Sequence, residues 1–268
     1  MGECEPFPLF PSKRAMKEDL YTGTFAGAQL TFAFRHPGTA RCFQGWLKPA
    51  CNPSEAINPI RVPLSDCEYW IREYGMKDDC DTEFGMSVYR ASDRLVKKNR
   101  CVVHGAAMVW REKAWLFMAD SGTGKSTQLD HWKTLWPEEV QILNGDKPVL
   151  RLEDDGTFTV HPSPWKGKED WGDDSLSAPL GGIILLKKNN KNHIDFLSPS
   201  GCAAKLLSLF FFSFEDRILL DALCVLEEKI ISSVPIWRLS NLGDQESSRL
   251  TYKTLLAWCE KMANKDNY

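Results

Sequence analysis

The sequence has no pair of closely spaced cysteines, although it contains nine cysteines in all. Zinc ribbons, zinc fingers and thioredoxin-type redox sites use such pairs, so their absence argues against these classes. The odd number and the scattered positions also argue against a framework of disulfide bonds. We therefore expect reduced thiols, as in a cytoplasmic protein.

Long apolar runs are missing too. The most apolar stretch, residues 206–214, contains two serines and is far shorter than the roughly 20 residues of a membrane-spanning helix. The first residues lack the basic segment and apolar core of a secretory signal, and Pro6 stands where an N-myristoylation motif needs Ser or Thr. We expect a soluble, cytoplasmic protein without a membrane partner.

An excess of basic charge is the third absence. The formal net charge is −3 and the isoelectric point is about 6.0. Because binding to the nucleic-acid backbone requires a basic surface, a general nucleic-acid binder is not expected. The 268 residues, 43% of them hydrophobic, suffice for one large domain or for a domain preceded by a smaller unit. The expected partner is a nucleotide, another small molecule or a protein.

What the sequence does contain is a phosphate-binding loop motif over residues 119–127. Its residues are Ala119, Asp120, Ser121, Gly122, Thr123, Gly124, Lys125, Ser126 and Thr127, with Ala119 where the first glycine is usual. In such a loop the backbone N–H groups and the helix N-terminus bind phosphate oxygens, the lysine reaches the β- and γ-phosphates, and the serine is placed to bind Mg²⁺. We expect residues 121–127 to bind a nucleotide with Mg²⁺.

The flanking sequence agrees with this motif. An apolar run of strand length, residues 114–118, precedes the loop, and residues 127–135 continue without Gly or Pro as a helix. The run 101–110 and the polar turn 111–113 predict a β-hairpin that leads into the loop. Trp132 and Trp136, four residues apart on the helix, are expected in the core.

Residues 1–99 are interpreted as a small α+β unit. The expected elements are an irregular lead-in over 1–24, paired strands over 28–35 and 42–47, an edge strand over 60–64 and helices over 65–73 and 84–98. Ser65 and Glu68 have the spacing of a capping box. The acidic run 78–81 is interpreted as a solvated loop rather than a metal site, because no ligand at useful spacing follows it.

Residues 100–268 are interpreted as the P-loop domain. Beyond the hairpin we expect strands over 140–143, 147–152 and 157–161, and a second hairpin from 182–187 and 194–197. Helices are expected over 200–213, 215–232 and 245–263, with a strand over 235–239. Hairpins combined with helices imply a mixed rather than a purely parallel sheet.

Three further stretches are candidates for chemistry. Asp146 follows the strand after the P-loop helix, where a P-loop enzyme needs an acid that binds Mg²⁺ or takes the proton of the attacking hydroxyl. His104 opens the hairpin whose second strand enters the loop, and a structural histidine is the alternative there. The loop 163–169 is a candidate substrate-binding segment, and a solvated loop anchored by an aromatic residue is the alternative. Its candidate residues are Trp165, Lys166, Gly167, Lys168 and Glu169.

Together, His104 and Gly105 before a hairpin, the loop 121–126 and Asp146 after the next helix resemble the HPr kinase/phosphorylase family over residues 100–240. That family shares its P-loop core with phosphoenolpyruvate carboxykinase. The resemblance implies an α/β fold with a mixed sheet and transfer of the γ-phosphoryl group of ATP to a hydroxyl with Mg²⁺. It implies that Lys125 and the loop amides bind phosphates, that Ser126 binds the metal, that Asp146 is the base or a metal ligand, and that His104 lines the acceptor side.

The chain differs from HPr kinases in carrying Gly145 and Asp146, followed by Lys147, where they have two adjacent acids. Their glycine- and arginine-rich signature is replaced by 163–169. A divergent kinase for a small-molecule or peptide serine is therefore expected. A nucleotide-binding regulatory module or an NTP hydrolase without an acceptor is the alternative. The C-terminal helices are apolar enough for an oligomer interface, but a core role explains them equally well.

Overall fold

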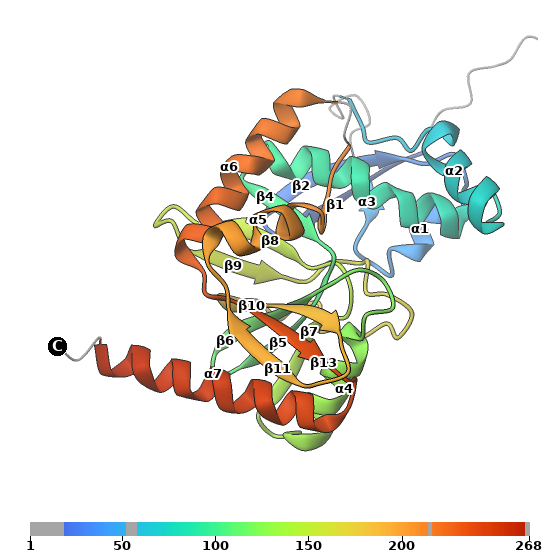
Figure 1. Ribbon diagram of the computed structural model, residues 1–268. Coiled ribbons are helices and arrows are strands. Elements are labelled where there is room, and N and C mark those ends of the chain that lie inside the picture. Colours follow the sequence, from blue (N-terminus) through green and yellow to red (C-terminus); the bar gives the residue numbers. More distant parts are fainter. Residues whose placement is uncertain (1–18, 52–57, 214–215, 266–268) are drawn as a thin grey trace, which may run out of the picture.

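Strand β6 (Lys113–Met118), which leads into the glycine-rich loop, lies inside a large mixed sheet (Figure 1). The computed structural model describes residues 19–51, 58–213 and 216–265. The sheet runs in the order β12, β4, β8, β9, β10, β6, β5, β7, and β13 pairs with both β10 and β11. Its other strands are β4 (Arg100–Val103), β5 (Gly105–Trp110), β7 (Val140–Asn144), β8 (Val149–Leu152), β9 (Phe158–His161), β10 (Ala178–Lys188), β11 (His193–Phe196), β12 (Phe210–Phe211) and β13 (Ile236–Asn241).

Strands β6, β10 and β13 are mutually parallel, and the other pairings are antiparallel. The predicted mixed sheet is therefore confirmed. Because parallel strands end at the same edge, the loop after β6 shares that edge with the carboxyl ends of β10 and β13.

The predicted hairpin is formed by β5 and β6. Arg111 and Glu112 turn it with φ values of +52° and +60°, the left-handed pair whose twist suits a two-residue hairpin. The run 101–110 is not one strand, however. It breaks at His104, and β4 turns away to pair with β8 and β12. This break places His104 at a corner rather than within a strand.

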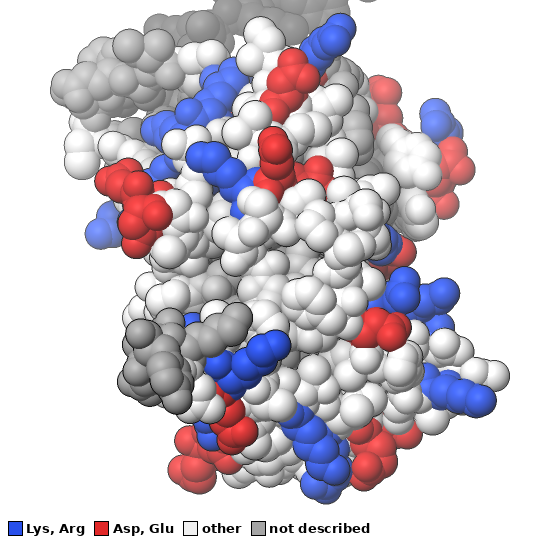
Figure 2. All heavy atoms as spheres, turned by 60° about the vertical axis from the view of Figure 1, so that its left-hand side comes forward, with Lys and Arg blue, Asp and Glu red and all other residues white. Residues whose placement is uncertain are grey.

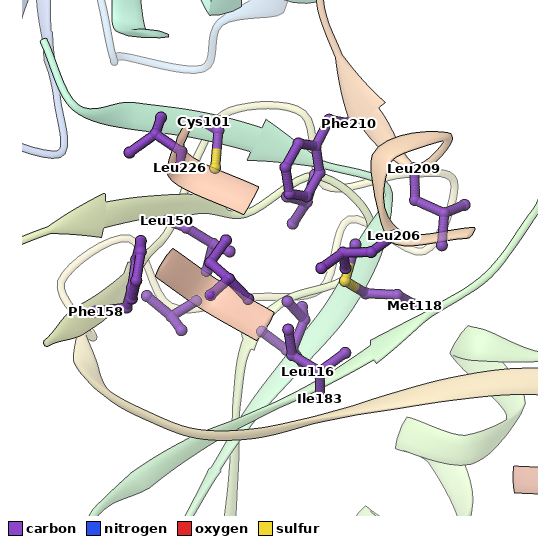
Figure 3. Close-up of a cluster of buried hydrophobic side chains, with 14 of the residues drawn as sticks. Cys101, Leu116, Met118, Leu150, Phe158, Ile183, Leu206, Leu209, Phe210 and Leu226 are labelled. Atoms are coloured by element: carbon purple, nitrogen blue, oxygen red, sulfur yellow. The ribbon is translucent and has the colours of Figure 1, made fainter. Parts of the chain in front are cut away.

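Helices cover both faces of the sheet. Along β6, Leu116 and Met118 point to one face, which α5 (Pro199–Leu207) and α6 (Arg217–Ser233) cover. Trp115 and Phe117 point to the other face, which α4 (Lys125–Leu135) and α7 (Gln245–Lys265) cover. Trp132 on α4 is fully buried there, as predicted. Figure 3 shows the first of these cores, with residues from β6, β8, β9, β10, α5 and α6 meeting in it.

The N-terminal strands differ from the prediction. Residues 20–25 form β1 (Leu20–Phe25) rather than irregular chain, and β1 pairs with the correctly predicted β2 (Ala28–Ala33). The strand predicted over 42–47 is wrong, because α1 (Thr39–Cys42) and turns occupy that stretch, and β1 pairs with β3 (Lys48–Pro49) instead. Of the strand predicted over 60–64, Ile60 forms a single bridge, to Phe32. Residues 1–18 of the predicted lead-in lie outside the described chain.

Helices α2 (Leu64–Tyr74) and α3 (Cys80–Val96) confirm the two predicted N-terminal helices. The capping box at Ser65 is wrong, since α2 begins after Pro63 and has no side-chain cap. Asp79 is the residue that caps a helix here, accepting a hydrogen bond from Thr82 N at the start of α3. The acidic run therefore belongs partly to a helix N-terminus.

The predicted hairpin of β10 and β11 is also wrong. Both strands exist, but β13 lies between them, parallel to β10 and antiparallel to β11. The helix predicted over 200–213 ends at Leu207, and β12 follows it.

A third apolar core joins the N-terminal elements to the large sheet. It contains Phe25, Phe32 and Phe43 from the N-terminal elements and Val149 and Trp165 from the region after residue 100. The domain boundary predicted at residues 99 and 100 stays a prediction, and this core crosses it.

Candidate nucleotide-binding site

The glycine-rich loop connects β6 to α4 and has an open, concave backbone. Gly122 and Gly124 have φ values of +71° and +109°, which residues other than glycine adopt with strain. A Cβ atom added at Gly122 would meet nothing within 4 Å. Gly124 is the N-cap of α4 and supplies no side-chain cap, so the first N–H groups of the helix are left for an acceptor from outside.

The side chains of this loop divide between its mouth and its floor. Ser121, Gly122 and Thr127 are exposed, Thr123 and Ser126 are half-buried, and Lys125 is buried with 7% of its surface exposed. Ser126 lies in the first turn of α4, directly after Lys125.

Lys125 is bound by groups around the loop. Its Nζ lies 2.9 Å from His104 Nε2, 3.0 Å from the carbonyl oxygen of Ala119 and 3.3 Å from that of Asp120. Burial lowers the pKa of Lys125, while the negative charge of Asp146 opposes that shift. Lys125 is thus a desolvated cation whose neutral carbonyl partners a phosphate could replace as a stronger acceptor. His104 Nε2 lies near both Lys125 and Asp146, and it accepts from the lysine or donates to the carboxylate according to its tautomer.

His104 connects Lys125 to Asp146. His104 Nε2 lies 3.3 Å from Asp146 Oδ1, and Lys147 forms an ion pair with the other carboxylate oxygen. The backbone N–H of Gly105 donates to the carbonyl oxygen of Asp146 at 2.9 Å. The structure therefore brings together three of the residues predicted as catalytic, which lie far apart in the sequence.

Asp146 is ionised in this setting. Burial would raise the pKa of its carboxyl group, but the hydrogen bond with His104 and the charge of Lys147 outweigh burial and lower the pKa to about 2. A carboxylate with so low a pKa is a weak base, yet it is well suited to accept a hydrogen bond from a hydroxyl and hold it in place.

Asn144 fixes the turn that carries Asp146, and the sequence interpretation missed it. Its Oδ1 accepts hydrogen bonds from the backbone N–H groups of Asp146 and Lys147, at 3.0 and 2.8 Å. Its Nδ2 donates to the carbonyl oxygen of Ser163 at 3.0 Å. The sequence did offer a signal, an asparagine directly after the apolar strand 140–143. A polar side chain at such a buried position must form hydrogen bonds, and those with nearby backbone groups fix the turn.

The loop 163–169 packs against this turn. A Cβ atom at Gly145 would lie 2.5 Å from the Lys166 carbonyl oxygen, and one at Gly167 would lie 3.0 Å from Asp146 Cβ. Lys166 is 8% exposed and its Nζ is paired with Asp174 at 2.9 Å. Lys168 and Glu169 are exposed. Gly167 therefore lies directly against the Asp146 side chain.

Trp165 has a different place from the rest of its loop. It is 2% exposed, packs against Phe25 and Phe84, and donates from Nε1 to the Phe84 carbonyl oxygen at 3.2 Å. Its ring anchors the loop in the third core. This arrangement matches the alternative interpretation of the sequence, a loop anchored by an aromatic residue. The ring offers no free face for a base or an acceptor in this arrangement.

A pocket of about 330 Å³ adjoins the glycine-rich loop on the side of β10 and β13. Asp120 and Thr123 of the loop line it together with Lys205 of α5 and Arg238 of β13. Lys205 Nζ is paired with both carboxylate oxygens of Asp120 at 2.7 Å. The sequence interpretation missed Lys205, because no motif marks it and only the fold brings α5 to the loop.

The charged surface is mixed in sign. On the face shown in Figure 2, basic and acidic side chains lie interspersed, with no continuous basic field. Within the described ranges, no helix has both the length and the apolar character needed to cross a bilayer.

No protein-family model matches the chain, and no curated protein matches it. Among solved structures, the HPr(Ser) kinase/phosphatase from Coxiella burnetii is similar to it. The identity is 13%, the match covers 62% of this chain and 94% of that chain, and the TM-score is 0.37. This is a distant likeness, so the function proposed below rests on the geometry of the site.

Proposed function

We propose that the chain is a phosphotransferase that binds ATP with Mg²⁺ at residues 121–127 and transfers a phosphoryl group to a hydroxyl acceptor. The acceptor would be a serine-type hydroxyl, in a small molecule, a peptide or a protein. The observation that carries the proposal is the connected set of Lys125, His104 and Asp146 beside an open glycine-rich loop. A loop that only held a nucleotide would not need the acid and the histidine.

The loop fits a nucleotide phosphate chain on two observations. The glycine at the helix N-cap leaves backbone donors without a side-chain acceptor, and the space over Gly122 is open. Lys125 would exchange its carbonyl contacts for phosphate oxygens. Ser126 and Asp146 would hold Mg²⁺, which would neutralise charge on the phosphates.

Transfer would depend mainly on positioning and charge. Asp146 would accept a hydrogen bond from the acceptor hydroxyl, and His104 would hold the carboxylate in place through its Nε2. Lys147, paired with Asp146, would keep that carboxylate ionised. Gly167 and the exposed Lys168 and Glu169 would border the acceptor, while Trp165 and Lys166 would hold their loop in position.

The test is transfer from γ-labelled ATP with Mg²⁺, offering free serine, other small alcohols, serine peptides and serine-containing proteins separately. Label on one acceptor class supports the proposal and names that class. Lys125→Ala is the negative control, and Lys133→Ala, on the same helix, is the matched lysine control. Label that is released only as phosphate, or that stays on bound ATP, would instead support a hydrolase or a nucleotide-binding regulatory module.

A further inference from the structure

Three potential metal ligands meet where α1 ends and α3 begins. They are the thiols of Cys42 and Cys80 and the carboxylate of Asp81, whose ligand atoms all lie within 4.8 Å of one another. Cys42 Sγ lies 3.5 Å from Asp81 Oδ1, and Cys80 Sγ lies 4.0 Å from the same atom. Cys42 stands 38 positions before Cys80, so the fold and not a sequence motif creates the group.

The two sulfur–oxygen spacings are close to the edges of a tetrahedral zinc site. Zinc bonds of about 2.3 Å to sulfur and about 2.1 Å to oxygen give sulfur–oxygen edges of about 3.6 Å and a sulfur–sulfur edge of about 3.8 Å. The two sulfur–oxygen distances of 3.5 and 4.0 Å are within about 0.4 Å of that geometry. The two sulfur atoms lie within 4.8 Å of each other, so they would have to approach by up to about 1 Å to reach the tetrahedral edge.

The neighbouring acids already have partners, whereas the side-chain contacts of Asp81 within the described chain are with the two thiols. Asp78 pairs with Arg35 and His36, Asp79 caps α3, and Glu83 accepts hydrogen bonds from Arg35, His36 and Thr39. No cationic partner of Asp81 is found among the described residues. Cys42 Sγ faces two carbonyl oxygens, of Gly38 and Cys80, both at 3.9 Å. The group is thus rich in acceptors, an environment that favours a cation.

We infer that Cys42, Cys80 and Asp81 form a binding site for a thiophilic divalent cation, of which Zn²⁺ is the representative. Two soft sulfur ligands and one carboxylate suit zinc and disfavour magnesium or calcium, which take oxygen ligands. Asp81 is exposed and both thiols are partly exposed, so water can complete the fourth position. Each thiol gives up its proton to solvent as its sulfur binds the ion.

Such an ion would join two segments of the N-terminal unit. It would fix the end of α1 to the first turn of α3. Helix α3 in turn holds Trp165 through the Phe84 carbonyl oxygen and Ser87 Oγ. The ion would therefore act as a structural clamp on the unit that supports the loop beside Asp146. This role does not depend on the proposed phosphoryl transfer.

The test uses the full chain, stripped with a chelator and kept reduced, and titrates it with Co²⁺ alone. We expect one equivalent of Co²⁺ to bind with a thiolate-to-cobalt charge-transfer band, and Zn²⁺ to displace it. Because loss of an outer-shell partner alone costs roughly 10–100-fold in metal affinity, Cys42→Ser, Cys80→Ser and Asp81→Asn should each weaken binding by at least about tenfold. Cys224→Ser removes an exposed thiol on α6 and should leave binding unchanged.

A second measurement needs no variant, in case a substituted chain does not fold. Alkylation of the unaltered chain followed by peptide mapping should show that Zn²⁺ protects Cys42 and Cys80 but not Cys224. Three results would overturn the inference. These are the absence of the cobalt band, a cobalt affinity in Cys42→Ser equal to that of the unaltered chain, and equal alkylation of Cys42 and Cys80 with and without Zn²⁺.

Discussion

Replacing Asp146 by asparagine tests the centre of the candidate site. The side chain keeps its shape and loses its charge, so His104 and Lys147 lose an ionic partner while the loop and Lys125 keep their own contacts. We expect ATP binding to remain and phosphoryl transfer to fall by about 10²–10⁴-fold, the usual contribution of a positioned acid or base.

The structure also sets the expected change in stability. A pKa lowered from 3.8 to about 2 corresponds to roughly 2 kcal/mol of favourable interaction with the ionised carboxyl group, whose side chain is 19% exposed. Asparagine keeps part of the hydrogen bonding, so we expect a loss of about 1–2 kcal/mol in the free energy of unfolding at pH 7. Because the folded pKa is depressed, this contribution is present above about pH 4 and is lost as the pH falls towards 2.

The assay combines ATP binding by calorimetry, transfer from γ-labelled ATP and urea denaturation at pH 7 and near pH 3. Asp130→Asn, at an exposed position on α4, is the matched control and should change none of the three. Near-normal transfer by Asp146→Asn would refute the role assigned to this carboxylate. An equal loss of stability at both pH values would refute the electrostatic explanation.

Four further substitutions test other parts of the structure. Lys125→Ala should abolish measurable phosphoryl transfer from γ-labelled ATP to the acceptor, because the loop loses its only buried cation among the described residues. Lys205→Ala removes the cation paired with Asp120 and leaves that negative charge unpaired beside the loop. ATP binding, measured by calorimetry, should weaken about tenfold, because the free carboxylate would repel the phosphates. An unchanged affinity would show that Lys205 does not affect phosphate binding. Burial raises the pKa of Glu227, whose Oε1 has no hydrogen-bond partner among the described residues, so Glu227→Gln should stabilise the fold by about 1 kcal/mol at pH 8 and less at pH 5, measured by urea denaturation. Trp165→Ala should cost about 3–5 kcal/mol in the same assay, and a loss below 1 kcal/mol would contradict its core position.

The pH dependence expected for Glu227→Gln follows from the raised pKa of Glu227 in the folded state. The folded state binds the proton of Glu227 more tightly than the unfolded state does. The buried glutamate therefore reduces the free energy of unfolding least below its ordinary pKa of 4.5. The cost grows as the pH rises through the folded pKa.

Local patterns predicted the parts of the fold that local physics determines. The apolar run of strand length at residues 114–118 and the polar turn over 111–113 correctly predicted β6 and the hairpin. The helices expected over 84–98 and 245–263 correspond to α3 and α7. The sequence also predicted Asp146 and His104 as candidates, and the structure places both beside Lys125.

Long-range pairing could not be predicted in the same way. The stretch 42–47 contains apolar residues at strand spacing, but Gln44 and Gly45 have positive φ values of +49° and +88° and turn the chain. The partner of β2 is β1, whose apolar residues alternate only weakly. Trp165 was ambiguous because its burial depends on Phe25 and Phe84, which lie far away in the sequence. Lys205 reaches Asp120 for the same reason, through tertiary structure alone.

The position of β13 has a consequence for how the chain folds during its synthesis. This strand leaves the ribosome after both of its neighbours, β10 and β11, and must enter between them. Until residues 236–241 are available, β10 has an open edge and β11 has no partner, and such edges can pair with other chains. Translation that stalls before this strand would therefore release a chain prone to aggregation, and slow emergence of the last quarter of the protein would prolong its dependence on chaperones.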